Sequence, residues 1–233
     1  MITWAGINSD TLGLTVERYP ARPRPAKKYR VISIPGRNGD LYVEVDTGAY
    51  SNCTQYYDIG IRGKAEGLPM AARSVTDWLY SPVGYQRLED SYEPDVFRMA
   101  YFAGPLDVEN MLNILGRASI EFSCKPQRFL KSGESSVAVT SGIYNPTAFP
   151  ALPIINITGS GAGRLQVGEY VVEILSLDGS ITLDSETQNA YRGTTNLNNT
   201  ISAPEFPQLI AGDNEISYTG AWTIEIIPRW WTL

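Results

Sequence analysis

The residue types that most often perform catalysis are scarce in this sequence of 233 residues. It contains no histidine, which excludes a Ser–His–acid triad, a histidine general base and a histidine metal ligand. Gly159-Ser160-Gly161 does not match the Gly-x-Ser-x-Gly turn of hydrolases, and no Lys-Ser or Lys-Thr follows it as in a phosphate-binding loop. We interpret these residues as a loop between strands, and we expect no catalytic residue and no enzymatic activity.

A cluster of carboxylates is the next candidate for chemistry. Glu89, Asp90, Glu93 and Asp95 lie within seven residues. Paired carboxylates can hydrolyse glycosidic bonds or hold a divalent cation. The spacing lacks the glycine and the register of a calcium-binding loop. We therefore interpret the cluster as a solvated turn and expect no metal site there.

The two cysteines, Cys53 and Cys124, are too few for a disulfide framework or a four-thiolate zinc site. Both lie in strand-like segments with small or apolar neighbours, which is typical of buried thiols without a chemical role. The sequence leaves open whether they are close in space. No cofactor is expected.

A basic stretch, residues 18–37, contains no acidic residue, and Pro20, Pro23 and Pro25 lie in its first half. Its cations are Arg18, Arg22, Arg24, Lys27, Lys28, Arg30 and Arg37. It could contact phosphates, an acidic partner protein or the wall of a channel, or it could be a solvated surface. The chain carries a net charge of −6 and no nucleic-acid-binding motif, so specific DNA recognition is disfavoured.

The charges divide the chain into two parts. Residues 1–131 hold 16 basic and 15 acidic residues, whereas residues 132–233 hold 3 and 10. Residues 132–150 are polar and rich in turn-forming residues. We predict an N-terminal domain over 1–131, a linker over 132–150 and a C-terminal domain over 151–233, although the end of the linker could belong to that last domain.

Hydrophobic periodicity predicts an all-β protein with one helix over 69–80, where apolar residues recur at helical spacing and Pro69 suits the first turn. Residues 108–115 could form a second, short helix. Alternation predicts half-buried strands at 41–45, 57–61 and 118–124. A strand over 29–34 should pair with 41–45 through a tight turn at Asn38-Gly39.

After the predicted linker, short strand-like runs recur about every 8–12 residues, which is typical of an antiparallel sandwich or jelly roll. These runs are 153–157, 164–167, 170–175, 180–183, 214–218 and 221–227.

Trp230 and Trp231 follow, and consecutive strand residues face opposite sides, so we expect one in the core and the other packed under a loop or exposed to a partner. Tyr191, Trp222, Trp230 and Trp231 are candidate contacts for a partner or a glycan.

The sequence shows no signal for a membrane. No stretch approaches the ~20 apolar residues that a spanning helix needs, so we expect no membrane insertion. The first residues lack a basic start followed by an apolar run, so we expect production in a cytoplasm without secretion.

Several ordered motifs resemble the distal tail (Dit) proteins of long, non-contractile-tailed bacteriophages. Ile34 to Leu41 looks like the Pro-Gly-Arg-x-Gly turn of that family. The helix ending Asp77-Trp78-Leu79-Tyr80 and the segment 120–129 follow in the family's order. The second half resembles the family at 153–157, 181–186, 191–193, 196–199, 206–207, 212–216 and 224–230. The resemblance covers nearly the whole chain.

This resemblance implies an N-terminal β-sandwich domain with a helix and a β-hairpin, which closes into a six-fold ring, and a C-terminal galectin-like jelly roll. The ring would join the major tail tube protein to the tail-tip hub, with a channel for the tape-measure protein and then DNA in transit. Receptor-binding proteins are a possible further partner, and the protein would be part of the virion, at the tail tip.

Two groups of residues are candidates for ring contacts. Pro35, Gly36, Arg37, Asn38 and Gly39 are a candidate subunit interface, and the basic residues from Arg18 to Arg30 are candidates for a channel lining or an inter-ring contact. The alternative function is a carbohydrate-binding adhesion module that contacts the host cell wall.

Overall fold

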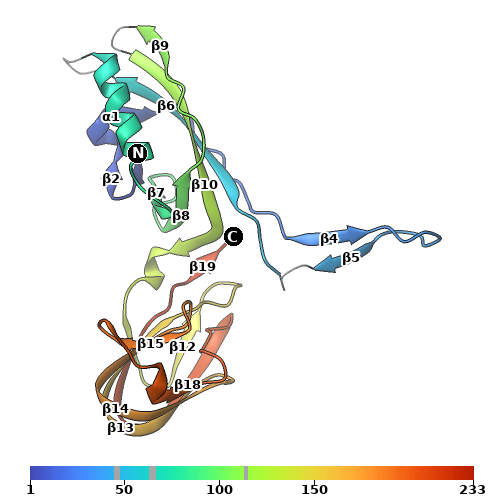
Figure 1. Ribbon diagram of the computed structural model, residues 1–233, viewed down its shortest axis with the longest axis vertical. Coiled ribbons are helices and arrows are strands. Elements are labelled where there is room, and N and C mark those ends of the chain that lie inside the picture. Colours follow the sequence, from blue (N-terminus) through green and yellow to red (C-terminus); the bar gives the residue numbers. More distant parts are fainter. Residues whose placement is uncertain (45–47, 63–66, 113–114) are drawn as a thin grey trace. The chain divides into compact units, whose positions relative to one another are not determined.

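The computed structural model describes residues 1–44, 48–62, 67–112 and 115–233 (Figure 1). They form two compact units, Met1–Arg128 with Leu233, and Phe129–Thr232. Strands make up most of the regular structure in both units, and α1 (Leu68–Tyr80) is the one α-helix in the described ranges. The all-β prediction is therefore confirmed.

The main sheet of the first unit has the order β2-β1-β7-β8-β10-β6-β3, and β9 pairs with β10. The central pair is antiparallel and runs from Leu115 opposite Arg62 to Cys124 opposite Cys53. The strands are β1 (Ile2–Trp4), β2 (Ile7–Asn8), β3 (Leu14–Val16), β6 (Cys53–Arg62), β7 (Gln86–Asp90), β8 (Val96–Phe102), β9 (Glu109–Leu112) and β10 (Leu115–Leu130).

Helix α1 packs its apolar face into the core of this unit. Leu68, Val75, Trp78 and Leu79 are buried, and the Trp78 indole N–H donates to the Trp4 carbonyl at 3.2 Å. The predicted helix over 69–80 is confirmed. Alternation along β6 and β10 also buries the expected side chains, namely Tyr57, Ile59, Ile61, Ile120, Phe122 and Cys124.

The predicted second helix over residues 108–115 is wrong for the part that the structure describes. Residues 109–112 form β9, which pairs antiparallel with β10 from Leu115 to Arg117. Residues 113–114 lie outside the described ranges. Pairing with β10 satisfies the backbone polar groups of this segment. The spacing of its apolar residues does not distinguish a helix from a strand, so the sequence could not reveal this pairing.

Strands β4 (Tyr29–Ile32) and β5 (Leu41–Glu44) form a separate two-stranded sheet (Figure 1). The predicted pairing is present, but its turn differs. The Arg37 N–H donates to the Ile34 carbonyl at 3.1 Å and Gly36 has φ of 80°, as in a type II turn with Pro35 at its second position. Asn38 does not adopt positive φ, so the predicted tight turn at Asn38-Gly39 is wrong.

The second unit contains a sheet with the order β11-β18-β13-β14-β15-β16, to which β12 and β17 add by pairing with β18 and β14. The strands of this sheet are β11 (Val137–Val139), β12 (Gly142–Asn145), β13 (Ile154–Val167), β14 (Tyr170–Asp184), β15 (Asn189–Arg192), β16 (Thr195–Asn196), β17 (Ile201–Ser202) and β18 (Gly212–Ile227). The last strand of the chain, β19 (Trp231–Thr232), is not part of this sheet. The 3-10 segments among the described residues are η1 (Ser9–Leu12) in the first unit, and η2 (Lys131–Gly133) and η3 (Asn198–Thr200) in the second. Strands β11 and β12 lie inside the segment 132–150 that the sequence indicated as a linker.

The six short strands expected after residue 150 are joined in pairs into β13, β14 and β18. Residues 159–161, interpreted from the sequence as a loop, lie inside β13, and Gly159 is opposite Gly179 of β14. The register of the pairing shifts between Gly161 and Gly163. Glycines here mark bends within long strands, so the expectation of separate turns was wrong.

Candidate assembly surfaces

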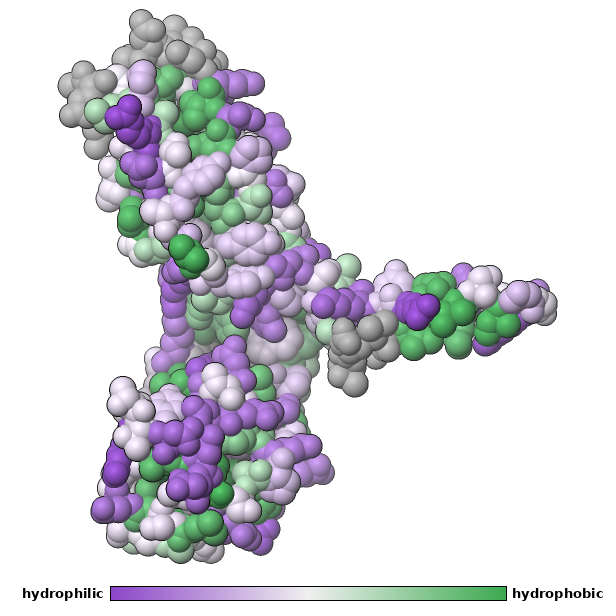
Figure 2. Space-filling view, in the orientation of Figure 1, coloured by the Kyte–Doolittle hydropathy of each residue, from purple (hydrophilic) through white to green (hydrophobic). Residues whose placement is uncertain are grey.

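The β4–β5 hairpin exposes apolar side chains on both of its faces. Partners across a strand pair share a face, so Val31 and Tyr42 point to one side, while Ile32 and Leu41 point to the other. Val31 and Tyr42 are each 51% exposed, and Tyr29 packs its ring 5.1 Å from that of Tyr42. The space-filling view shows the resulting hydrophobic band along the hairpin (Figure 2).

This exposure makes the hairpin a candidate interface. The half-buried strand predicted over 41–45 is not half-buried in the single chain, and Val45 lies outside the described residues. A two-stranded hairpin is at best marginally stable alone in water, and an exposed apolar surface of this kind marks an interaction site. All residues from Pro35 to Gly39 are exposed at its tip.

The basic stretch divides into two groups. At its start, Arg18 lies 3.9 Å from Asp58, and Arg22 lies 3.5 Å from Glu93 and donates to the Tyr92 carbonyl at 3.0 Å. Burial and the nearby charge of Arg128 lower the pKa of Arg24. These arginines therefore lie among the charges of their own unit.

The later cations belong to the hairpin and its base. Lys27 forms a β-bridge with Tyr50, and the Lys28 N–H donates to the Ala49 carbonyl at 2.9 Å. The Arg30 and Arg37 side chains make no ion pair or hydrogen bond with any residue that the structure describes.

The acidic cluster has a structural role rather than forming a solvated turn. Glu93 accepts hydrogen bonds from Arg98 at 3.1 Å and from Arg128 at 2.6 Å. Asp90 accepts one from the Tyr57 hydroxyl at 2.7 Å. Burial opposes ionisation of Glu93, but the two arginines outweigh it and lower the pKa of Glu93. Within the described ranges, no group of three Asp, Glu or Cys residues is arranged to hold a metal ion.

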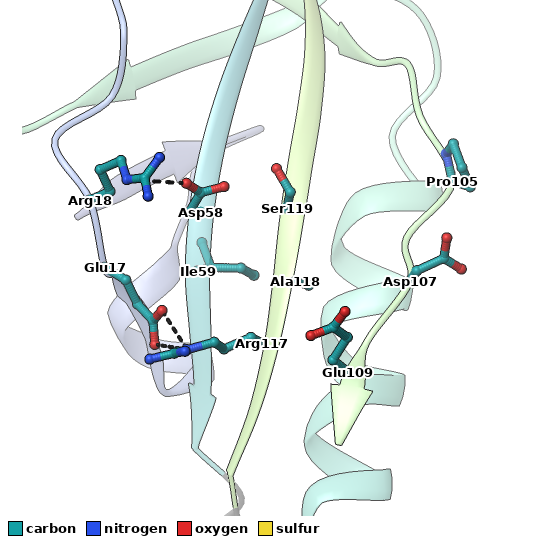
Figure 3. Close-up of a pocket in the computed structure, with 10 residues that line it drawn as sticks. All are labelled: Glu17, Arg18, Asp58, Ile59, Pro105, Asp107, Glu109, Arg117, Ala118 and Ser119. Carbon is teal, nitrogen blue, oxygen red and sulfur yellow. Dashed lines mark hydrogen bonds and ion pairs between the residues drawn. The ribbon is translucent and has the colours of Figure 1, made fainter. Parts of the chain in front are cut away.

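A hollow of about 620 Å³ lies on the outer side of β6 and β10 (Figure 3). On its walls, Glu17 pairs with Arg117 at 2.7 Å and Arg18 lies near Asp58. The Glu109 carboxylate turns towards β10 in Figure 3, yet it forms no ion pair or hydrogen bond with the part of the chain that is described. The lining residues are Glu17, Arg18, Asp58, Ile59, Pro105, Asp107, Glu109, Arg117, Ala118 and Ser119.

The aromatic candidates of the second unit do not form an exposed platform. Trp222 and Trp230 are 6% and 5% exposed and belong to the core. Trp231 stacks on Phe149 with ring centroids 4.5 Å apart, and its indole N–H donates to the Pro150 carbonyl at 2.8 Å. Tyr191 is half-buried in β15. Two of the four candidates are therefore inaccessible to a glycan in this fold.

The described helix is too short and too polar to cross a membrane.

No family model and no curated protein matches this sequence. Among solved structures, the chain is similar to the crystal structure of the Dit protein of phage SPP1, described there as a paradigm of the hub adsorption apparatus in phages that infect Gram-positive bacteria. The match covers 100% of this chain and 98% of that one, with a TM-score of 0.78 and 12% identity. Two structures of the phage P2 baseplate in its activated conformation, with Ca and with Sr, match 89% of this chain at a TM-score of 0.48 and 12% identity.

The similarity to the SPP1 protein establishes the fold. Both units are matched together across essentially the full length of each chain. The chain therefore has the distal tail fold. The resemblance to that family, which the sequence motifs indicated, is confirmed for the fold.

Proposed function

We propose that this protein is a structural subunit of a phage tail tip, where it forms the ring that joins the tail tube to the tail-tip hub. The similarity of the whole chain to the SPP1 Dit protein carries this proposal. The arrangement of the side chains agrees with it, because the candidate carboxylates Asp90 and Glu93 are engaged in hydrogen bonds within the fold. The proposed role is therefore non-enzymatic.

The ring is a homohexamer in this proposal, and the β4–β5 hairpin is its principal inter-subunit contact. The hairpin exposes apolar side chains on both faces, as expected of a surface that is covered after assembly. A contact between different surfaces of identical subunits generates a closed ring when its rotation closes.

The remaining partners follow from that position in the tail. The ring binds the major tail tube protein on one side and the tail-tip hub on the other. Its central channel lets the tape-measure protein and then DNA pass, and the second unit faces outwards, where receptor-binding proteins attach. The protein is made in the bacterial cytoplasm and ends in the virion.

The alternative of a carbohydrate-binding adhesion module is not retained. Such a module needs an exposed aromatic surface beside polar groups. Trp222 and Trp230 are in the hydrophobic core, and Trp231 already stacks on Phe149.

The first experiment is the native mass of the purified chain, measured by light scattering over a series of concentrations. Six copies of the 25.7 kDa chain give a species of about 154 kDa. Twice that mass indicates two stacked rings and also supports ring closure. A monomer at every concentration contradicts a self-closing ring.

A further inference from the structure

We propose that the hollow on the outer side of β6 and β10 receives the tip of the β4–β5 hairpin from a second copy of this chain, with Arg37 placed against Glu109. This proposal rests on the ring of the proposed function and names the two surfaces that meet in it.

The acceptor surface has room and unsatisfied charge. The hollow measures about 620 Å³. Its lining contains four carboxylates and two guanidinium groups. Glu17 is already paired with Arg117, and Arg18 lies near Asp58. Glu109 and Asp107 are exposed and pair with none of the residues described, so the hollow retains negative charge for a cationic partner.

The donor surface has the complementary properties. Arg37 is exposed at the tip of the hairpin and makes no side-chain interaction with the described residues. The type II turn at Pro35-Gly36 fixes the backbone immediately before it. The tip therefore presents a guanidinium on a defined turn, and guanidinium–carboxylate pairs are among the stronger charge-assisted hydrogen bonds.

A second copy is the occupant that these observations favour. The hairpin is exposed along its length, so it does not occupy the hollow of its own chain. Each chain carries one donor and one acceptor, which differ in shape and charge. Such a contact is heterologous, and its repetition around an axis produces a ring rather than a two-fold dimer.

Cysteine trapping tests the contact directly. Arg37→Cys and Glu109→Cys are combined in one chain, in a Cys53→Ser background that removes the accessible native thiol. Mild oxidation with oxidised glutathione should convert two thiols into one disulfide and release two molecules of reduced glutathione. A non-reducing gel should then show a ladder of linked copies that ends at six.

The matched control replaces Glu109→Cys by Glu169→Cys, which is exposed at the turn between β13 and β14. That pair should give no ladder. If the wild-type chain is hexameric but the variant with Arg37→Cys and Glu109→Cys forms no linked copies, the hollow is not the acceptor. The ring proposal would then still stand. A wild-type protein that is monomeric at every concentration overturns both.

Charge exchange provides a second, independent test. Arg37→Glu and Glu109→Arg should each weaken association by about tenfold or more, because attraction becomes repulsion. The two changes together should restore most of the association that each single change removes. Arg73→Glu, an exposed residue of α1, should leave association unchanged. Equal losses in the single and the combined variants, measured by sedimentation, would overturn the pairing of Arg37 with Glu109.

Discussion

Cys53 of β6 and Cys124 of β10 lie directly opposite each other in the antiparallel pair. Both are free thiols, but their surroundings differ, because Cys124 is fully buried and Cys53 is partly exposed. Burial raises the pKa of Cys124 to about 12, although Arg98 acts in the opposite direction. The expectation of a buried, unreactive thiol therefore describes Cys124 better than Cys53.

The first prediction concerns thiol reactivity. The thiolate is the reactive form, and at about pH 8 only roughly one Cys124 in ten thousand is ionised. Iodoacetamide should therefore label Cys53 in the native protein and reach Cys124 only after unfolding in guanidinium chloride. Peptide mass spectrometry identifies the labelled residue, and rapid native labelling of Cys124 would contradict its complete burial.

The second prediction concerns the charge network around Glu93. Glu93→Gln leaves Arg98 and Arg128 without their shared carboxylate in a largely buried position. Removing one partner of such a network costs about 3 kcal/mol in the free energy of unfolding. Urea titration measures the loss. Asp95→Asn, an exposed residue of the same acidic cluster, is the matched control and should change stability by less than about 0.5 kcal/mol.

The third prediction gives the pH dependence of the same group. The pKa of Glu93 in the folded protein is lowered from its ordinary value of 4.5, so its contribution to stability is fully present above that value. It should be lost as the pH falls below 4.5 and through the folded-state pKa. Urea midpoints measured between neutral and acidic pH should fall less steeply in Glu93→Gln than in the wild type. Parallel curves would show that Glu93 does not contribute.

The fourth prediction separates assembly from folding in the hairpin. Val31→Asp places a charge on an exposed apolar face, so the unfolding of the single chain should change by less than about 0.5 kcal/mol. The hexamer should nevertheless be lost, because the charge is buried when subunits meet. Val83→Asp is the control, since Val83 is 88% exposed outside the hairpin. Intact hexamers in Val31→Asp would remove the hairpin from the interface.

The fifth prediction concerns a glycine in the second unit. A Cβ at Gly163 would lie 2.0 Å from the Thr219 carbonyl oxygen and 2.5 Å from the Trp222 ring. Gly163→Ala should therefore destabilise the fold by about 2–3 kcal/mol, as overpacking of a core does. Thermal unfolding measures the change, with exposed Ala162→Ser as the control. If Gly163→Ala left the thermal stability unchanged, β18 would have room to move away from the added Cβ.

Local patterns determined the fold class and the helix. The helical spacing of Leu68, Val75 and Trp78 and the alternation along β6 and β10 predicted structures that are present. These signals are readable because each depends on the period of one element, and the backbone geometry alone sets that period. The ordered motifs similarly indicated the distal tail fold, which the similarity to the SPP1 protein confirms.

Only the tertiary structure decided which side chains are available. The burial of Trp222, the engagement of Arg22 by Glu93 and the opposition of Cys53 to Cys124 all join segments far apart in the chain. The continuity of β13 through Gly159 likewise depends on the neighbouring strands that pair with it. Sequence periodicity contains no information on which distant surface covers a residue, because strand pairing and burial are set by the packed chain as a whole.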